Sequence, residues 1–313
     1  MQKHDWQGVF PAITTPFLES FAVDHARLAK HVAWLADHGC RGIVALGSLG
    51  EAATLTFDEK ISILETIKRT LGDRVPLVAG IAGLSTAECV ALAQRAADAG
   101  CDGLMVLPPY VYRGDWRESK AHFDAVISAT PLSCMLYNNP IAYGTDVSPE
   151  EMRELSSHDN LHAVKESSGD VRRITAIRET NGNRLVMFAG MDDAILESIP
   201  MGARGWVAGL VNALPAESVR VFEAGRDGAW DEARALYEWF LPLLRLDTVP
   251  KFVQLIKLVQ TEVGQGNAVV RAPRLELHGA ELAEVQALIR ECLSRRPALS
   301  SPRITRAEPA FAS

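Results

Sequence analysis

Residues 161–170 read Leu-His-Ala-Val-Lys-Glu-Ser-Ser-Gly-Asp, a short apolar run that ends in a lysine and is followed by polar residues and a glycine. An apolar run of this length bounded by turn residues is typical of a buried strand. Lys165 then ends the strand, where desolvation favours the neutral amine over the ammonium. A neutral amine can attack a carbonyl or imine carbon and form a Schiff base. The alternative is a surface lysine that pairs with Glu166.

The same strand-then-helix pattern recurs over the first two thirds of the chain. We expect eight strands, at Gly8–Thr14, Gly42–Leu46, Pro76–Ile81, Gly103–Leu107, Ser133–Tyr137, His162–Glu166, Leu185–Ala189 and Gly205–Ala208. Eight strand–helix units predict an α/β fold of the TIM (β/α)8 barrel type. A doubly wound open sheet is the rival fold, but it usually has fewer strands, and no Gly-x-Gly-x-x-Gly sequence follows the first strand here.

Capping signals mark several helix boundaries. Ser85–Glu88 and Ser148–Glu151 both fit a capping box, and Asp24 and Asp58 are further N-cap candidates. Glycine is expected just after the end of three helices, at Gly39, Gly100 and Gly202.

The strand signal stops near residue 214. Residues 215–226, 228–246, 250–264 and 279–295 have apolar positions at helical spacing. We therefore divide the chain into a barrel with the catalytic site over residues 1–214, a C-terminal helical extension packed on the barrel over residues 215–296, and a flexible tail over residues 297–313. The tail mixes Pro, Ser, Arg and Ala without a period.

Composition narrows the class of protein. The chain has 313 residues, 48% hydrophobic and 23% charged, as in an ordinary globular protein with a full core. Its net charge of -7 argues against nucleic acid as the main partner. No apolar stretch approaches the roughly 20 residues of a membrane span, and the start lacks the features of a signal peptide. The five cysteines show no Cys-x-x-Cys spacing, so we expect a cytoplasmic protein without disulfides or zinc.

Five strand ends carry residues with useful chemistry, and in such a barrel catalysis takes place at the carboxyl ends of the strands. The second strand runs into Gly47–Glu51, where backbone N–H groups and the Ser48 hydroxyl could hold a carboxylate. The fifth strand ends in Tyr137-Asn138-Asn139-Pro140, and the sixth delivers Lys165. A phenol beside an amine can relay protons, although a buried core tyrosine is the alternative. Glycine turns end the last two strands, at Gly190–Asp193 and Gly205–Gly209.

Together with Phe10–Phe17, these motifs resemble the dihydrodipicolinate synthase / N-acetylneuraminate lyase family of Schiff-base-forming barrels, over about residues 6–295. The resemblance implies that Lys165 is the Schiff-base lysine and that Tyr137 is the proton-relaying phenol. It also implies that Ser48 and the Leu49 backbone hold the substrate carboxylate, and that the protein is a homotetramer. The substrate contacts expected at the site are Gly47, Ser48, Leu49, Asn139, Gly190 and Val207, the last through its carbonyl.

Three departures distinguish this chain from the synthase branch of that family. Leu49 stands where the synthase has a second hydroxyl residue in the glycine turn. Ala142 stands where the synthase has an arginine that grips a second carboxylate, so bidentate binding by that side chain is lost. Val111 stands where a tyrosine reaches a neighbouring subunit. These differences argue against the lysine-biosynthetic synthase.

A narrower resemblance concerns three longer strings, Tyr137–Gly144, Lys165–Arg173 and Trp239–Leu244. They are similar to those of the 1-pyrroline-4-hydroxy-2-carboxylate deaminases of hydroxyproline degradation. That resemblance implies dehydration and deamination of a small cyclic imino acid to 2,5-dioxopentanoate. No metal or other cofactor is expected, because the covalent iminium is the electron sink.

Several alternatives stay open. A 2-keto-3-deoxy sugar acid dehydratase or aldolase, or a lyase acting on pyruvate or another 2-oxo acid, would use the same iminium, and Asn138 and Asn139 could hold sugar hydroxyls. A metal-dependent barrel enzyme would need clustered His, Asp or Glu at the strand ends, which the sequence does not show. A non-catalytic binding barrel predicts a solvated lysine. Glu51, Glu166 and Asp192 are candidate supporting residues, and Trp206 could shape the pocket or fill the core.

Overall fold

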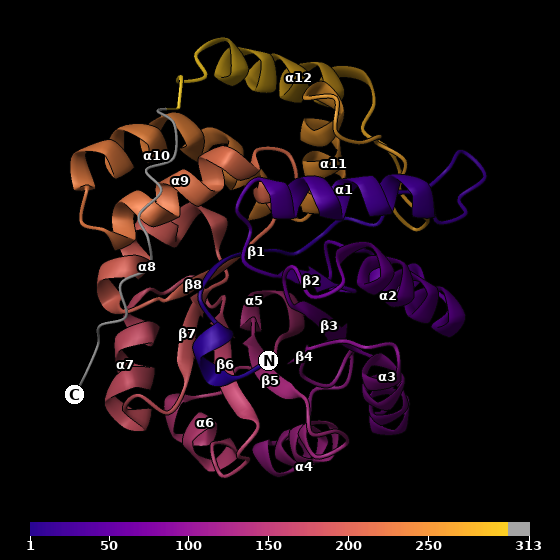
Figure 1. The fold of residues 1–313 in the computed structure, drawn as a ribbon, viewed down its shortest axis with the longest axis vertical. Helices are drawn as coiled ribbons and strands as arrows, with labels where there is room; N and C mark the ends of the chain where they lie inside the picture. The colour runs from indigo at the N-terminus through magenta and orange to yellow at the C-terminus, as the bar shows by residue number, and fades with distance from the viewer. Residues whose placement is uncertain (300–313) are drawn as a thin grey trace.

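The computed structural model describes residues 1–299 and shows eight parallel strands arranged around a common axis (Figure 1). Consecutive strands are neighbours, and β1 also pairs with β8. A parallel bridge between Ala12 and Val44 joins the first strand to the second, so the sheet closes into the predicted (β/α)8 barrel. The strands are β1 Gly8–Pro11, β2 Ile43–Ala45, β3 Leu77–Ile81, β4 Gly103–Val106, β5 Ser133–Asn138, β6 Leu161–Glu166, β7 Val186–Ala189 and β8 Gly205–Ala208.

All eight predicted strands are confirmed: eight of their sixteen ends agree with the prediction, and seven differ by one residue. The first strand is three residues shorter than expected, because the chain leaves the sheet after Pro11. The Thr14 N–H bonds to the side chain of Asn212, at 3.3 Å, and not to a neighbouring strand. A partner 198 residues away in the chain is invisible to a local pattern.

Helices surround the barrel as the alternating pattern predicts, and α5 lies close to the barrel axis in the view of Figure 1. The helices over the first two thirds of the chain are α1 His25–Asp37, α2 Phe57–Leu71, α3 Thr86–Asp98, α4 Trp116–Ile127, α5 Pro140–Tyr143, α6 Pro149–Leu155, α7 Arg172–Asn181 and α8 Ile195–Met201. Short 3-10 turns follow several strands, at η2 Ala52–Thr54, η3 Asp192–Ala194 and η4 Leu210–Asn212; η1 Lys3–Asp5 precedes the first.

Four helices follow the barrel, as predicted, and lie on the side of α1 and α8 (Figure 1). They are α9 Pro215–Arg226, α10 Trp230–Leu244, α11 Phe252–Glu262 and α12 Gly279–Ser294, with the turn η5 Arg245–Asp247 between α10 and α11. The predicted tail falls largely on residues 300–313, which lie outside the described residues. Within residues 1–299, no helix is both long and apolar enough to cross a membrane.

Most of the predicted caps are confirmed. Asp24 accepts a hydrogen bond from the third residue of α1, and Ser148 forms a reciprocal capping box. Ser85 caps α3, but the glutamate of the expected box bonds to a different backbone N–H. The prediction for Asp58 was wrong: Thr56 is the N-cap of α2, and Asp58 lies inside the first turn. Positive φ angles mark the three glycines that follow helices, Gly39, Gly100 and Gly202.

Aromatic side chains fill the barrel interior. Trp6, Phe10 and Phe188 form a cluster with ring centroids 5.3–5.9 Å apart. Glycines in the neighbouring chain segments make room for these rings: a Cβ at Gly42, just before β2, would lie 2.6 Å from Phe10 Cδ1, and one at Gly205 in β8 would lie 2.6 Å from Phe188 Cδ1. The large rings and the small strand residues therefore fit together, and the polar chemistry is left to the strand ends.

Candidate active site

Lys165 is buried at the end of β6, with 6% of its surface exposed. Its register partner on β5 is Tyr137, and its Nζ atom lies 4.2 Å from the centroid of the Tyr137 ring. The alternative of a surface lysine paired with Glu166 was wrong. The Glu166 carboxylate accepts hydrogen bonds from Asn138 Nδ2 at 3.0 Å and from the backbone N–H of Ser168 at 2.6 Å.

Gly190, which follows β7, lies directly against the lysine side chain. A Cβ atom at this position would be 2.8 Å from Lys165 Cε and 2.9 Å from Lys165 Cγ. Atoms in ordinary contact are 3.4–4 Å apart, so only glycine leaves room for the lysine stem. The expected residue Gly190 is thus brought to the lysine, and it acts through its lack of a side chain.

A second tyrosine, Tyr143, contacts both Tyr137 and Ser48, and no motif in the sequence pointed to it. Tyr143, at the end of α5, packs edge-on against Tyr137 with ring centroids 5.7 Å apart. Its hydroxyl forms a short hydrogen bond with the Ser48 hydroxyl. Burial raises the pKa of Tyr143, so this phenol keeps its proton at neutral pH. The structure therefore brings Ser48, Tyr137 and Lys165 together through a residue of α5.

The α5 turn explains why Tyr143 reaches the site. Asn139 caps this short helix by accepting a hydrogen bond from the Ala142 N–H at 2.9 Å, and Pro140 occupies its first position. The same asparagine donates a hydrogen bond from Nδ2 to the Tyr137 hydroxyl at 3.0 Å. An Asn-Pro pair is a helix-start signal, and it could have placed Tyr143 one turn further on.

The glycine turn after β2 is held from the far side by the C-terminal extension. Leu49 in this turn is buried, and a Cβ at Gly47 would meet only Met105, at 3.8 Å. Glu51 has a positive φ of 56° and a buried carboxylate that accepts hydrogen bonds from Lys257 Nζ and the Arg271 N–H. Glu51 therefore fixes the turn to α11 and the segment after it, and it is not paired with the lysine of the site.

Asp192 and Trp206 form a buried pair beside the last two strands. The Asp192 carboxylate accepts hydrogen bonds from Trp206 Nε1 at 3.0 Å and from the backbone N–H groups of Gly209 and Leu210, the latter at 2.8 Å. Burial raises the pKa of Asp192 to about 6, while these donors and the charge of Lys165 oppose the rise. Trp206 is a fully buried core residue. Its neighbour Val207 has Phe10 as its register partner, and the expected role of the Val207 carbonyl stays a prediction.

Asp247, a half-buried acid in the turn η5, packs against Gly209, and no motif in the sequence pointed to it. A Cβ at Gly209 would lie 2.6 Å from Asp247 Oδ2, so the carboxyl group rests on the Gly209 backbone. Asp247 Oδ1 is buried and has no hydrogen-bond partner within residues 1–299. Burial and the Asp192 charge hold the pKa of Asp247 well above its ordinary value, against the pull of Lys165. Asp247 lies 82 residues after Lys165, in the turn that follows α10, where no local signal marks it.

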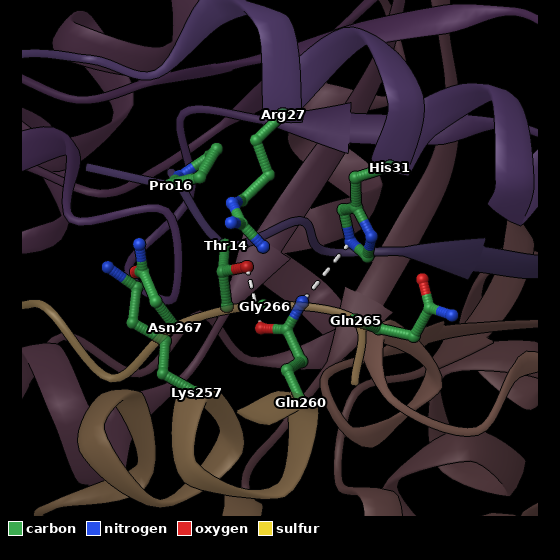
Figure 2. A pocket seen from close by; sticks show the side chains of 9 residues that line it. All are labelled: Thr14, Pro16, Arg27, His31, Lys257, Gln260, Gln265, Gly266 and Asn267. Atoms are coloured by element: carbon green, nitrogen blue, oxygen red, sulfur yellow. Dashed lines mark hydrogen bonds between the residues drawn. The ribbon is translucent and has the colours of Figure 1, made fainter. Parts of the chain in front are cut away.

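A separate small cavity lies between α1, α11 and residues 265–267 (Figure 2). Its free volume of about 10 Å³ is room for about one water molecule and not for an organic acid. Thr14 donates a hydrogen bond to Gln260 Oε1 at 2.8 Å, and the Gln260 amide lies 3.5 Å from His31 Nε2 (Figure 2). The cavity is therefore not the substrate site.

The residues of this cavity nevertheless brace the turn that follows β8. His31 Nε2 donates to Asn212 Oδ1 at 2.9 Å, and Asn212 Nδ2 donates to the Gly209 carbonyl at 2.8 Å. The N–H of the same Gly209 bonds to Asp192. A continuous polar network thus connects α1 and α11 to the buried carboxylate of Asp192.

Comparisons with known proteins agree with the barrel fold and identify the family. Residues 5–292 match the dihydrodipicolinate synthetase family. The 4-hydroxy-tetrahydrodipicolinate synthase of Methanosphaerula palustris is 32% identical over 292 residues, which cover 92% of this chain and 99% of that protein. A dihydrodipicolinate synthase from Bacillus anthracis has a TM-score of 0.87 at 28% identity, covering 91% of this chain and 98% of that chain. An Escherichia coli K12 prophage protein of the dihydrodipicolinic acid synthase family, solved with pyruvate, also has a TM-score of 0.87, at 25% identity and with 92% and 99% coverage.

Proposed function

This chain belongs to the dihydrodipicolinate synthetase family of lyases, and from that premise we propose that it forms a Schiff base at Lys165 and acts as a 1-pyrroline-4-hydroxy-2-carboxylate deaminase. The observation that carries the proposal is the buried lysine with its Nζ over the face of Tyr137, at 4.2 Å from the ring centroid. A desolvated amine next to a phenol is suited to attack a carbonyl or imine carbon and to exchange protons with the adduct. The pyruvate in the Escherichia coli relative is a 2-oxo acid with such a carbon.

The first step forms the covalent adduct. The neutral amine of Lys165 attacks C2 of the cyclic imine, and the bond between C2 and the ring nitrogen breaks after proton transfer. The ring nitrogen becomes a primary amine on C5, and C2 becomes an iminium carbon bound to Lys165. Tyr137, whose hydroxyl oxygen accepts a hydrogen bond from Asn139, keeps its own proton free for the exchange.

The remaining steps use the iminium as the electron sink. C3 loses a proton to a base helped by Tyr137, and the C4 hydroxyl leaves as water. Tautomerisation moves the unsaturation to the C5–N bond, where one water molecule enters and ammonia leaves. A second water molecule hydrolyses the C2 adduct, which frees Lys165 and 2,5-dioxopentanoate. As proposed, the chemistry takes no metal and no organic cofactor.

The substrate has a single carboxylate, and the glycine turn beside Ser48 is the proposed place for it. The Ser48 hydroxyl and the backbone N–H groups of the Gly47–Gly50 turn can hold an anion. The Ser48–Tyr143 hydrogen bond places a second hydroxyl at the same point. The absence of an arginine at Ala142 agrees with a substrate that has no second carboxylate to bind.

The amide side chains favour the pyrroline acid over a sugar acid. Asn138 is buried, and its amide bonds to Asp146, Glu166 and the Val147 N–H. Asn139 is committed to Tyr137 and to the cap of α5. The two amides that could hold sugar hydroxyls are therefore already engaged. A 2-keto-3-deoxy acid dehydratase stays the second candidate because it would use the same iminium.

The test compares ammonia release from 1-pyrroline-4-hydroxy-2-carboxylate with turnover of a panel of 2-keto-3-deoxy acids. In parallel, borohydride is added with each compound, and mass spectrometry locates the reduced adduct. We expect ammonia release from the pyrroline acid and an adduct on Lys165 that disappears in Lys165→Ala. Turnover of the sugar acids alone would replace the deaminase by the dehydratase. An adduct with none of the compounds would remove the lysine mechanism.

A further inference from the structure

We propose that Asn138 is a positioning residue for Tyr137 and Lys165: its buried amide side chain ties β5 to β6 beside this pair and closes the loop that carries Tyr143. This inference rests on the proposed function of Lys165 and deepens it, because it states what holds the amine against the phenol. Asn138 is 1% exposed, so its amide serves other groups of the protein and not a ligand.

The amide joins the two strands directly after the reacting pair. Asn138 and Glu166 follow Tyr137 and Lys165 on their strands, and they are register partners as well. Asn138 Nδ2 donates to Glu166 Oε2 at 3.0 Å, and the Ser167 N–H donates to the Asn138 carbonyl at 2.9 Å. Successive side chains of a strand point to opposite faces, so this bond lies behind the pair and leaves the substrate side free. It therefore fixes the spacing of the two strands where Tyr137 meets Lys165.

The same amide closes the loop of residues 139–147. Its second N–H donates to Asp146 Oδ1 at 3.1 Å, and its oxygen accepts a hydrogen bond from the Val147 N–H at 2.9 Å. The loop begins directly after Asn138 and returns to its side chain, so one residue holds both ends. Tyr143 lies within this loop, and its hydroxyl reaches the glycine turn only while the loop keeps its shape.

The three partners of the side chain require an amide. The Glu166 and Asp146 carboxylates accept hydrogen bonds, whereas the Val147 N–H donates one. Asparagine offers two N–H donors and one oxygen acceptor, which matches this set. An aspartate of the same shape has no donor and would add a third negative charge, and a leucine would leave all three partners without a hydrogen bond. Glu166 is also anchored by the Ser168 N–H at 2.6 Å, so the link continues into the turn after β6.

The test uses Asn138→Asp, which keeps the shape of the side chain and removes both donors. In the double variant Asn138→Asp/Glu166→Gln, the new glutamine amide can donate to the new aspartate, so the link between the strands returns with reversed polarity. Asn160→Asp is the matched control. This half-buried asparagine precedes β6, at the opposite end of that strand from Lys165, and its amide donates to three backbone carbonyls at 3.0–3.2 Å.

The rate of borohydride trapping is measured at saturating pyruvate, beside urea unfolding of the same samples. Asn138→Asp should trap roughly tenfold more slowly than the wild type or worse, because repelling carboxylates move the strand ends apart. The double variant should trap at least about threefold faster than the single variant. Asn160→Asp should lose stability and trap at the wild-type rate. Equal losses of rate in Asn138→Asp and Asn160→Asp, or a double variant no faster than the single one, would overturn the proposal.

Glu166→Gln breaks the same link from the other strand and decides the matter if Asn138→Asp does not fold. It should trap at least about threefold more slowly than the wild type, and an unchanged rate would then overturn the proposal.

Hydrogen exchange provides a readout that needs no substrate. The backbone N–H groups of residues 139–147 should exchange faster in Asn138→Asp than in the wild type or in Asn160→Asp. Unchanged exchange would refute the closure of the loop by Asn138. Absence of any adduct in the wild type would instead refute the proposed role of Lys165, while hydrogen exchange still tests the contacts of Asn138.

Discussion

Replacing Gly190 by alanine should damage the lysine chemistry more than the fold. The new methyl group would lie 2.8 Å from Lys165 Cε, so this atom must retreat by about 0.6 Å to regain an ordinary contact of 3.4 Å. The same methyl group would also collide with Ser167 Oγ, which is buried and unpartnered within residues 1–299 and can therefore rotate without loss of a hydrogen bond. The strain then falls on the lysine.

The expected magnitude follows from these contacts. Overpacking of a well-packed site costs about 1–3 kcal/mol of unfolding free energy. Misplacement of a reacting group by about 1 Å can cost about 100-fold in rate, so a shift of more than half that distance predicts a loss of roughly tenfold or more. Gly225 in α9 offers a control, because a Cβ atom there would lie 2.8 Å from the Cδ1 atom of Ile199, the same distance as to Lys165 Cε at Gly190.

The assay is the rate of borohydride trapping with pyruvate, measured beside urea unfolding of the same samples. Gly190→Ala should trap slowly, and Gly225→Ala should trap at the wild-type rate even if its stability falls by a similar amount. A wild-type trapping rate in Gly190→Ala would mean that the amine does not depend on this close contact. The close packing of Lys165 against Gly190 would then not be required for adduct formation.

Three further predictions concern other parts of the site. Tyr143→Phe should fold normally and lower turnover by about 10- to 100-fold, because the hydrogen bond to Ser48 is lost; unchanged turnover would exclude this hydroxyl from catalysis. Burial lowers the pKa of His31 to about 4. Below about pH 6.5 the unfolded chain therefore binds a proton at this residue that the folded chain does not. The free energy of unfolding should fall by about 2 kcal/mol between pH 7 and pH 5 for this reason. Urea unfolding should show a smaller fall in His31→Gln, and an equal fall would assign it to other groups. The Arg113 guanidinium packs against Gly144, where a Cβ atom would lie 2.7 Å from Arg113 Nη1. A substrate with a single carboxylate, held at the Ser48 turn, does not need this guanidinium as a second binding group. Arg113→Ala should thus keep ammonia release within about threefold, and a larger loss would place substrate binding at this residue.

The barrel itself could be predicted because its signals are local. Each strand is a short apolar run, each is followed by a helix, and parallel strands end at the same edge. That edge brings Tyr137, Lys165 and Gly190 together, as the order of the motifs indicates. Locality also explains the errors. Asp58 and Thr56 both fit a helix start, and only the cap hydrogen bond distinguishes them.

The residues that the sequence did not reveal are those placed by distant segments. Tyr143 reaches Ser48 because α5 turns back over the strand ends, and Asp247 reaches Gly209 because η5 follows a helix of the extension. Neither contact can be predicted from a local sequence pattern, because Tyr143 is 95 positions from Ser48 and Asp247 is 38 positions from Gly209. The proposed role of the Val207 carbonyl is still a prediction, because its known neighbour is Phe10.

The C-terminal helices consequently do more than cover the barrel. Through Lys257, α11 fixes Glu51 and with it the glycine turn that carries Ser48. Through Gln260, the same helix contacts His31, whose partner Asn212 holds the carbonyl of Gly209. The turn η5 after α10 adds a further contact, because the Asp247 carboxyl group packs against Gly209. A barrel alone would provide Lys165 and Tyr137 at its strand ends, but the Gly47–Glu51 turn and the turn after β8 would lose the contacts that fix them. Changes in this extension should therefore alter the chemistry at Lys165 without touching the strand that carries it.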